Sequence, residues 1–422
     1  MAYFDSNIGT FDGHAEFIRY DCASAIATIF HQVKSMPRPV NFRLSPFPVF
    51  LLLATTIAIL ALIHDAGQRL PDFLVPTGEQ ASPKAQFDSS YICHPCAGPQ
   101  VHSASVVEGK NGDLFAVWFG GSREGARDVR IYASRLIAGT GKWSHESSLL
   151  DRKKSGSDLH RFIKKLGNPV LGRSKDGRLW LFYVTVSAGG WSGSAINYRI
   201  SADNGKTWSV SRRLVTTPFF NVSTLVHGLP VARTDGTLTV PVYHELLGKF
   251  SEMLRVDKNG RVLSKKRVSH GKQSFQPTVV ALGGHTAVML ARSASPANRH
   301  IFISLSQDAG KNWSEPVPTS LPNPDAGIAV TSGRDKSLLV VYNDSQHDRS
   351  NLALAVSHDT GKTWKRIFYF EKENVPNSGE EYSYPMIIHS GDQYHLVYTW
   401  RRKGIRYIHF NSEWVIQQEG RR

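Results

Sequence analysis

The octapeptide Ser201-Ala202-Asp203-Asn204-Gly205-Lys206-Thr207-Trp208 recurs twice along the chain, as SQDAGKNW at 306–313 and as SHDTGKTW at 357–364. All three copies share the pattern S-x-D-x-G-x-x-W, and each follows an apolar, alternating run. Asp accepts hydrogen bonds from nearby backbone N–H groups and Gly tolerates a positive φ, so both favour a tight turn. We therefore predict that each copy is a structural β-hairpin corner, held by its Asp and covered by its Trp.

The spacing of these corners gives the repeat length of the fold. Trp313 and Trp364 lie 51 residues apart, and Trp208 lies 105 residues before Trp313, which is about two repeats. Weaker versions stand where further copies are expected: Gly141-Lys142-Trp143, Asp257-Lys258-Asn259-Gly260 and Asn411-Ser412-Glu413-Trp414. A period near 50 residues made of short strands is typical of a β-propeller with one four-stranded blade per repeat. The sequence therefore predicts an all-β, six-bladed β-propeller.

The repeated pattern resembles the Asp-box, or BNR repeat, of the sialidase superfamily. The stretch VWFGGSREGARDV at 117–129 further resembles bacterial sialidase-like proteins with a BNR-repeat-like domain, and together the two likenesses cover about residues 95–415. They imply a glycoside hydrolase of the exo-α-sialidase type. Asp-boxes also occur in propellers that are not enzymes, so the resemblance specifies the fold better than the substrate.

An apolar run precedes the repeats. Residues 47–63 (FPVFLLLATTIAILALI) carry no charge. The length of this run is at the short end of the range for a transmembrane helix. Basic residues precede this run, so the positive-inside rule places the N-terminus in the cytoplasm. We expect a cytoplasmic segment (1–46), a single-pass anchor in the inner membrane (47–66), a linker (67–90) and a propeller on the periplasmic side (91–418). A cleaved signal peptide is the alternative.

The overall charge limits the choice of partners. The net charge is +15 and the pI is near 9.7, which suits an acidic glycan or an anionic membrane. No basic helix, zinc pattern or RNA-binding aromatic motif is present, so we expect no nucleic-acid partner. EF-hand spacing and HExxH are also absent, so we expect no metal and no cofactor. Cys93 and Cys96 are expected to form a local disulfide in an oxidising compartment, with free thiols as the alternative.

The family resemblance also implies a catalytic arrangement. A sialidase uses a tyrosine nucleophile activated by a carboxylate, a second carboxylate as acid/base, and arginines that hold the substrate carboxylate. The nucleophile is expected to be Tyr382 or Tyr384, which the strand period of two places on one face. The candidate carboxylates are Glu381 or Glu245 for activation and Glu124 or Asp128 for acid/base catalysis. The candidate substrate-binding residues are His102, Arg123, Arg292, Arg349, Tyr243, His244 and Asn343.

One position departs from the family pattern. Typical sialidases open the first blade with Arg-Ile-Pro, whereas this chain reads Val101-His102-Ser103. Histidine is a weaker, pH-dependent partner for an anion, so the carboxylate clamp is expected to be incomplete. A uronate therefore fits as well as sialic acid. Two other functions stay open: a polysaccharide lyase acting on uronate-containing glycans, and a glycan-binding propeller without activity.

Overall fold

The computed structural model divides the chain into two compact units, residues 1–68 and 69–422. It describes residues 50–53, 55–56, 69–75, 82–217, 221, 223–271, 273–373 and 379–421. Within these ranges no helix has the length and apolar character needed to cross a bilayer. The expected cytoplasmic segment and most of the expected anchor lie outside the described residues, so the anchor stays a prediction.

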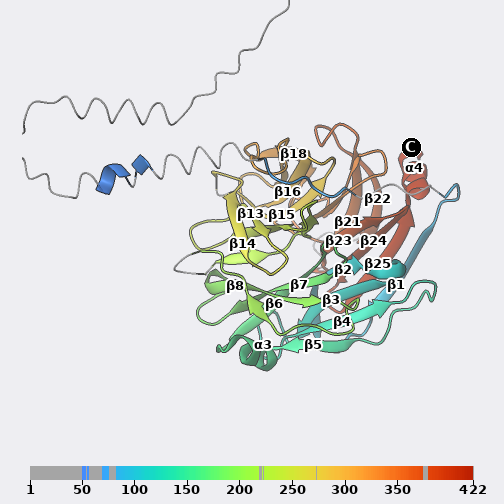
Figure 1. Ribbon diagram of the computed structural model, residues 1–422. Coiled ribbons are helices and arrows are strands. Elements are labelled where there is room, and N and C mark those ends of the chain that lie inside the picture. The colour runs from blue at the N-terminus through green and yellow to red at the C-terminus, as the bar shows by residue number, and fades with distance from the viewer. Residues whose placement is uncertain are drawn as a thin grey trace, which may run out of the picture. The chain divides into compact units, whose positions relative to one another are not determined.

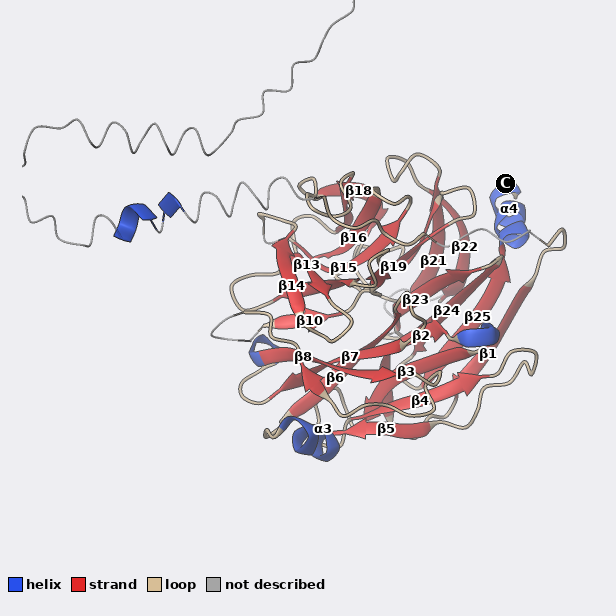
Figure 2. Ribbon diagram, in the orientation of Figure 1, coloured by secondary structure: helices blue, strands red, loops and turns tan. Residues whose placement is uncertain are grey.

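The second unit is a β-propeller of six antiparallel sheets, which confirms the expected architecture (Figure 2). The innermost strands are β2 (Gln100–Glu108), β6 (Lys165–Arg173), β10 (Thr224–Val226), β15 (Ser274–Ala281), β19 (Ala329–Ser332) and β23 (Tyr382–Ser390). The second strands are β3 (Leu114–Gly121), β7 (Leu179–Val186), β12 (Leu238–His244), β16 (Ala287–Ser293), β20 (Leu338–Tyr342) and β24 (Gln393–Trp400). A short strand β11 (Val231–Ala232) also pairs with β12.

The outer half of each blade follows the same order. The third strands are β4 (Arg130–Leu136), β8 (Ser194–Ser201), β13 (Phe250–Val256), β17 (His300–Ser306), β21 (Asn351–Ser357) and β25 (Gly404–Asn411). The outermost strands are β5 (Ser147–Asp151), β9 (Arg212–Arg213), β14 (Val262–Arg267), β18 (Val317–Pro322), β22 (Lys365–Lys372) and β1 (Phe87–Cys93). Two α-helices, α3 (Arg152–Leu159) and α4 (Ser412–Gly420), and two 3₁₀ turns, η1 (Lys110–Gly112) and η2 (Trp191–Gly193), complete the described elements of this unit.

The ring is closed by the N-terminal strand. β1 pairs antiparallel with β25, so the first strand of the propeller forms the outer edge of the last blade (Figure 1). The propeller thus begins at Phe87, before the expected start at 91. Because β1 occupies this edge, the weak repeat at 411–414 is not a strand corner as expected. Asn411 instead caps the N-terminus of α4 by accepting a hydrogen bond from the Trp414 N–H.

The hydrophobic core is divided among the blade interfaces. Each of six buried clusters joins one blade to the next, so every blade packs on two neighbours. Trp180 and Leu254, for example, are fully buried between the second and third blades. Burial of one such aliphatic side chain contributes about 1.5–3 kcal/mol. The interfaces therefore hold the inner strands, and any side chains at their ends, on a rigid ring.

The Asp-boxes lie at the turns between third and fourth strands, as expected. In the copy at 306–313, Asp308 accepts hydrogen bonds from the Asn312 backbone N–H at 2.8 Å and from the Ser306 hydroxyl at 3.0 Å. The Trp313 indole N–H donates to the Gly310 carbonyl at 3.2 Å, which holds the ring over the turn. The turn of the weak repeat at 257–260 is also held by its aspartate, since Asp257 accepts a hydrogen bond from the Asn259 N–H at 2.9 Å. These aspartates are structural.

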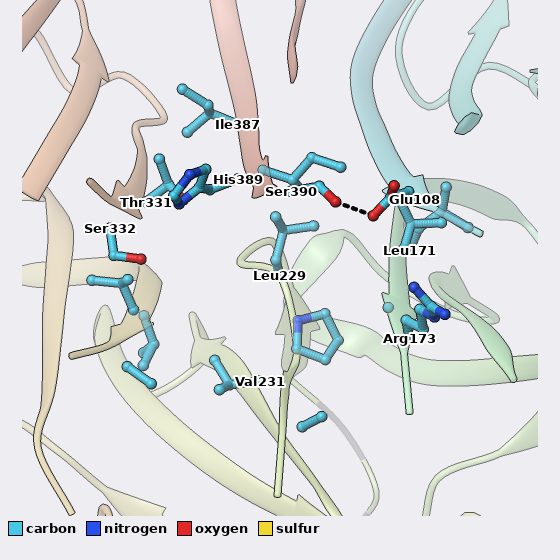
Figure 3. A pocket seen from close by; sticks show the side chains of 18 of the residues that line it. Glu108, Leu171, Arg173, Leu229, Val231, Thr331, Ser332, Ile387, His389 and Ser390 are labelled. Atoms are coloured by element: carbon cyan, nitrogen blue, oxygen red, sulfur yellow. Dashed lines mark hydrogen bonds between the residues drawn. The ribbon is translucent and has the colours of Figure 1, made fainter. Parts of the chain in front are cut away.

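The inner strands surround a central channel with two distinct ends. At the C-terminal ends of these strands, on the same side as the Asp-boxes, the channel widens into a cavity of ≈ 440 Å³. Figure 3 shows its wall, where the Ser390 hydroxyl donates to the Glu108 carboxylate. Residues 69–75 also pack on this side: Phe73 is buried, its N–H bonds the Gly284 carbonyl, and its ring lies under Arg233 at 4.3 Å. The candidate site described next lies at the opposite, N-terminal ends.

Cys93 and Cys96 form a disulfide, which confirms the first of the two alternatives for this pair. Together with Glu146 they are the one group of metal-type side chains in the described part of the chain. Because both sulfurs are already bonded to each other, this group does not offer thiolate ligands to a metal.

Candidate active site

The site begins with bulges near the start of the inner strands. Asn168, Gln276 and Tyr384 have positive φ values of 47°, 50° and 51°, and each lies where the strand register shifts. An L-residue in this region costs about 1–2 kcal/mol. A bulge inserts an extra residue, so the side chain no longer follows the alternation of the strand. Three blades thereby direct a polar side chain out of the sheet and into one pocket.

That pocket has a volume of ≈ 140 Å³, and it opens among the connections on this side of the propeller. Its lining residues come from blades one to four and blade six. They are Glu124, Asn168, Trp191, Leu225, Tyr243, Glu245, Lys249, Phe275, Gln276, Arg292 and Tyr384. Five of the predicted site residues therefore share one cavity: Glu124, Tyr243, Glu245, Arg292 and Tyr384.

Arg292 is the more deeply buried of the two cations that line the pocket. Its side chain is 8 % exposed and lies over the Phe275 ring at 4.9 Å. Nε donates to the Asp325 carboxylate at 2.7 Å, while Nη1 donates to Gln276 Oε1 at 2.7 Å and to the Tyr384 hydroxyl at 3.2 Å. The guanidinium is thus fixed from three sides. A fixed, buried guanidinium is a strong and directional partner for a carboxylate.

The two candidate nucleophiles do not share a face, which corrects the expectation from the strand period. Tyr384 is half-buried and lines the pocket, whereas Tyr382 is 1 % exposed and belongs to the core cluster between the last two blades. The Tyr382 hydroxyl donates to Glu373 and accepts from Arg401 Nε at 3.0 Å. The bulge at Tyr384 breaks the period of two, so only Tyr384 reaches the pocket.

The rings of two buried histidines pack against the Tyr384 ring. The His102 and His227 rings lie 4.4 and 5.2 Å from it, both close to perpendicular. Burial, helped by the nearby positive charge of Arg402, lowers the pKa of His102 to about 3. Burial and Arg292 likewise lower the pKa of His227 to about 3. Both rings are neutral at pH 7, so His102 does not replace the positive charge that a first-blade arginine would carry.

A cation from the last blade stands near this position instead. Arg402 donates from Nε to Glu381 at 2.8 Å and lies 3.6 Å from Glu124. Arg349 also binds Glu381, at 3.3 Å, and its guanidinium lies 5.9 Å from the centre of the Tyr384 ring. Burial raises the pKa of Glu381, but His102, Arg402, Ser383 and Arg349 together outweigh it and lower this pKa to about 2. Glu381 is therefore an ionised anchor for arginines, and it is not among the residues that line the pocket.

The remaining carboxylates divide between the pocket and its surroundings. Glu245 lines the pocket, and burial raises its pKa against the opposing effect of Lys249 and Arg292. Glu124 lines it from the first-blade loop. Asp128, the alternative to Glu124, accepts hydrogen bonds from the Ser122 N–H and hydroxyl at 2.8 and 2.9 Å, which lower its pKa and make it a clamp for that loop.

Three further predicted binding residues lie elsewhere. Arg123 is exposed and is absent from the pocket lining. His244 stacks on Phe250 at 4.7 Å and accepts the Leu247 N–H, so it holds a local turn. Asn343 is fully buried and donates to the Tyr382 carbonyl at 2.8 Å, joining two blades. Tyr243, in contrast, is inside the pocket, where its hydroxyl accepts from Asn168 at 3.2 Å and from Gln276 at 3.3 Å.

Several pocket and neighbouring residues were not singled out from the sequence: Asn168, Trp191, His227, Lys249, Gln276, Asp325 and Arg402. A sequence signal for some of them exists. Asn168, Gln276 and Tyr384 all immediately precede a proline at the start of an inner strand. Such a polar-residue–Pro pair, repeated in three blades at equivalent positions, would have indicated the bulges and the pocket they serve.

The comparisons with known proteins agree with this architecture. A model of the BNR repeat-like domain family matches residues 112–396, and the chain belongs to that family. The expected sialidase-like superfamily is thereby confirmed. A search of curated proteins gave no match.

Solved structures of sialidases share the fold at low sequence identity. The Hadza microbial sialidase Hz136 superposes with a TM-score of 0.63 at 15% identity, covering 76% of this chain and 67% of that one. The leech intramolecular trans-sialidase gives 0.59 at 14% identity, covering 82% and 72%. The intramolecular trans-sialidase of Ruminococcus gnavus, solved with oseltamivir carboxylate, gives 0.60 at 13% identity, covering 77% and 97%.

Proposed function

We propose that this protein is a glycoside hydrolase of the exo-α-sialidase type, which removes a terminal acidic sugar with Tyr384 as its nucleophile. The observation that carries the proposal is that Tyr384, the buried Arg292 and two carboxylates, Glu124 and Glu245, line one pocket. A cavity of ≈ 140 Å³ lies below the range of about 300–1,000 Å³ for ligand pockets. Its small size favours one sugar residue at a chain end.

The chemistry assigns a role to each pocket group. Arg292 binds the sugar carboxylate, with Arg349 and Arg402 as the nearby cations. Glu245 accepts the phenolic proton as the Tyr384 oxygen bonds to the anomeric carbon, and Glu124 gives its proton to the departing glycosidic oxygen. Water then attacks the same carbon, its proton returns to Glu124, and the tyrosine leaves and recovers its proton from Glu245. A neutral tyrosine suits an anomeric carbon that carries a carboxylate, because a carboxylate nucleophile would be repelled.

Turnover of fluorogenic substrates tests the proposal. The full-length protein is assayed with a sialoside and a glucuronide, next to Tyr384→Phe and the matched control Tyr382→Phe. We expect release of the fluorophore from at least one of them, loss of at least 1,000-fold in the Tyr384 variant, and little change in the Tyr382 variant. Equal activity of the Tyr384 variant and the parent would refute its role. Binding of acidic sugars without any turnover would instead establish a glycan-binding propeller.

A polysaccharide lyase acting on uronates is the second candidate. It is favoured by one specific feature: among the described residues, the side chain that hydrogen-bonds the Tyr384 hydroxyl is Arg292 and not a carboxylate. In a lyase, Arg292 would neutralise the uronate carboxylate while Tyr384 moves a proton. A lyase product contains an unsaturated sugar that absorbs in the ultraviolet and a hydrolase product does not, so absorbance during digestion of polygalacturonate separates the two.

We also propose that the apolar run at 47–63 anchors the protein in the inner membrane with the propeller in the periplasm. The support is the sequence alone. Fractionation of cells that express the full chain should recover it with the membrane until detergent is added, and protease should reach the propeller only after the outer membrane is opened. Recovery in the soluble fraction with residues 47–63 still present would contradict the anchor.

A further inference from the structure

A set of cations leads away from the pocket across blades two and three. We call Arg161, Lys164, Lys165, Arg213 and Lys249 the basic arc. Lys249 lines the pocket, and Lys165 lies beside its rim, with its ammonium 5.6 Å from the ring of Trp191. Arg161 and Lys164 are exposed in the connection between α3 and β6, and Arg213 ends β9.

The basic arc lacks close ion pairs, although Lys249 acts on the pocket carboxylate Glu245 and opposes the rise in its pKa. In the described part of the chain, no carboxylate lies within 4.0 Å of any of its five cations. Asp158, which precedes this connection in α3, is already bonded to Ser211 at 2.8 Å and lies 3.8 Å from Arg199. Glu124 is 3.6 Å from Arg402.

The partners of these cations are instead carbonyls and aromatic rings. Arg213 donates to the Asn221 carbonyl at 2.8 Å and Lys164 to the Gly189 carbonyl at 3.4 Å. Lys249 lies 4.5 Å from the centre of the Phe275 ring. Burial, together with repulsion from Arg161, lowers the pKa of Arg213, so like charges are held close together. Unpaired cations at close range raise the local concentration of anions and favour an anionic ligand.

We propose that the basic arc binds the part of an anionic polysaccharide that extends from the sugar held in the pocket. The inference rests on the proposed function for that terminal sugar and adds that the substrate is a polyanion and not a neutral chain with one acidic end. Sugars beyond the first would lie over Trp191 and Lys165 and then reach Lys164, Arg161 and Arg213. An anionic bilayer fits less well, because a flat surface does not reach Lys249 inside the pocket.

The test removes the outer cations, which lie away from the chemistry. The variant Arg161→Gln/Lys164→Gln/Arg213→Gln is compared with Lys206→Gln/Lys258→Gln/Lys362→Gln, which removes the same charge from exposed turns at the Asp-box end. Binding of the full-length protein to polygalacturonate and to neutral dextran is measured from 50 to 500 mM NaCl. Since each exposed contact is weak, we expect the arc variant to bind the polyanion about 10-fold more weakly, with a smaller dependence on salt. The control variant and dextran binding should not change.

Other results distinguish failure of this inference from failure of the proposed function. Equal weakening in both variants would show that only the net charge matters. Binding to phosphatidylglycerol vesicles through the arc, without binding to polygalacturonate, would assign the surface to a bilayer. If the parent turns over a small fluorogenic sugar but ignores the polyanion, the inference fails and the proposed function stands. If it binds the polyanion through the arc without turnover of any substrate, the hydrolase fails and the arc stands.

Discussion

Two buried arginines at opposite ends of the propeller allow function and stability to be separated. Arg292 at the pocket and Arg233 at the Asp-box end are 8 % and 2 % exposed, and each lies over a phenylalanine ring and donates three hydrogen bonds. Arg233 donates to the Thr239 hydroxyl and to the carbonyls of Pro71 and Ala309. The substitutions Arg292→Met and Arg233→Met keep the length of the side chain and remove its charge and its donors.

The expected sizes follow from what each change leaves behind. Asp325, Gln276 and Tyr384 occupy Nε and Nη1 of Arg292. A substrate carboxylate is left the two N–H groups of Nη2, which can give up to two charge-assisted hydrogen bonds of about 1.5–3 kcal/mol each. Loss of both lowers kcat/KM by about 100- to 10,000-fold, at about 1.4 kcal/mol for each factor of ten. Arg292→Met leaves one buried acceptor, Gln276 Oε1, which costs about 1–3 kcal/mol of stability; Asp325 is half-exposed and is rehydrated. Arg233→Met leaves two carbonyls and a hydroxyl, for about 2–5 kcal/mol.

The assay combines steady-state kinetics on the substrate that the parent accepts with urea unfolding of the same preparations. Arg292→Met should lose most activity and less stability than Arg233→Met, and Arg233→Met should keep its activity below its unfolding transition. If Arg233→Met does not fold, Arg233→Lys takes its place. Equal loss of activity in both variants at matched folded fractions would show that Arg292 acts only through stability, and the assignment of a carboxylate site would fall.

Three further predictions concern single groups. Burial raises the pKa of Glu245, so its charge opposes folding above the unfolded pKa. The variant Glu245→Gln should therefore have lower activity and a higher melting temperature at pH 7, and the gain in melting temperature should disappear below about pH 4. An unchanged melting temperature would contradict the burial of Glu245. Burial also raises the pKa of Asp308, but hydrogen bonds from Asn312 and Ser306 outweigh burial and lower this pKa. The variant Asp308→Asn should therefore lose about 1 kcal/mol of unfolding free energy in urea at pH 7 and nothing at pH values below the folded pKa. A loss that persists in strong acid would refute the structural role of the ionised Asp308. Replacing Cys93 and Cys96 by Ser should cost about 2 kcal/mol, since the closed loop is short, and should leave turnover intact; loss of turnover in a folded variant would give the pair a further role.

The repeat was readable from the sequence because turn chemistry is local. The Asp of each Asp-box accepts a hydrogen bond from a backbone N–H four residues later, so the turn depends only on residues of its own octapeptide. Three corners, and with them the blade count, therefore follow from the pattern. The positions of Arg292 and Glu245 at strand ends were also predictable, since a propeller gathers such ends. The disulfide was expected only on the assumption of an oxidising compartment, since the tight spacing of Cys93 and Cys96 left free thiols open.

The parts that escaped prediction depend on contacts between distant residues. Tyr384 reaches the pocket because the inner strand of its blade contains a bulge. The prediction assumed an unbroken period of two, which would have put Tyr382 and Tyr384 on the same face of the strand. Glu381 is held by Arg349, which precedes it by 32 residues, and by Arg402, which follows it by 21, so its pairing cannot be read from its neighbours in sequence. Asn343 has a polar side chain of the kind that binds sugars, yet its amide donates a hydrogen bond that joins two blades. In each case the decision lies in the packing between blades.

Covalent trapping tests the central claim most directly. The full-length protein is incubated with a sialosyl fluoride that carries a second fluorine beside the anomeric carbon, which slows release of the sugar from the enzyme, and with the corresponding fluorinated uronosyl fluoride. Digestion and fragment-ion mass spectrometry then locate the label. The account predicts one sugar on the Tyr384 oxygen, absent in Tyr384→Phe and retained in Tyr382→Phe. A label on Tyr382 or on a carboxylate, or turnover without any label on Tyr384, would contradict it.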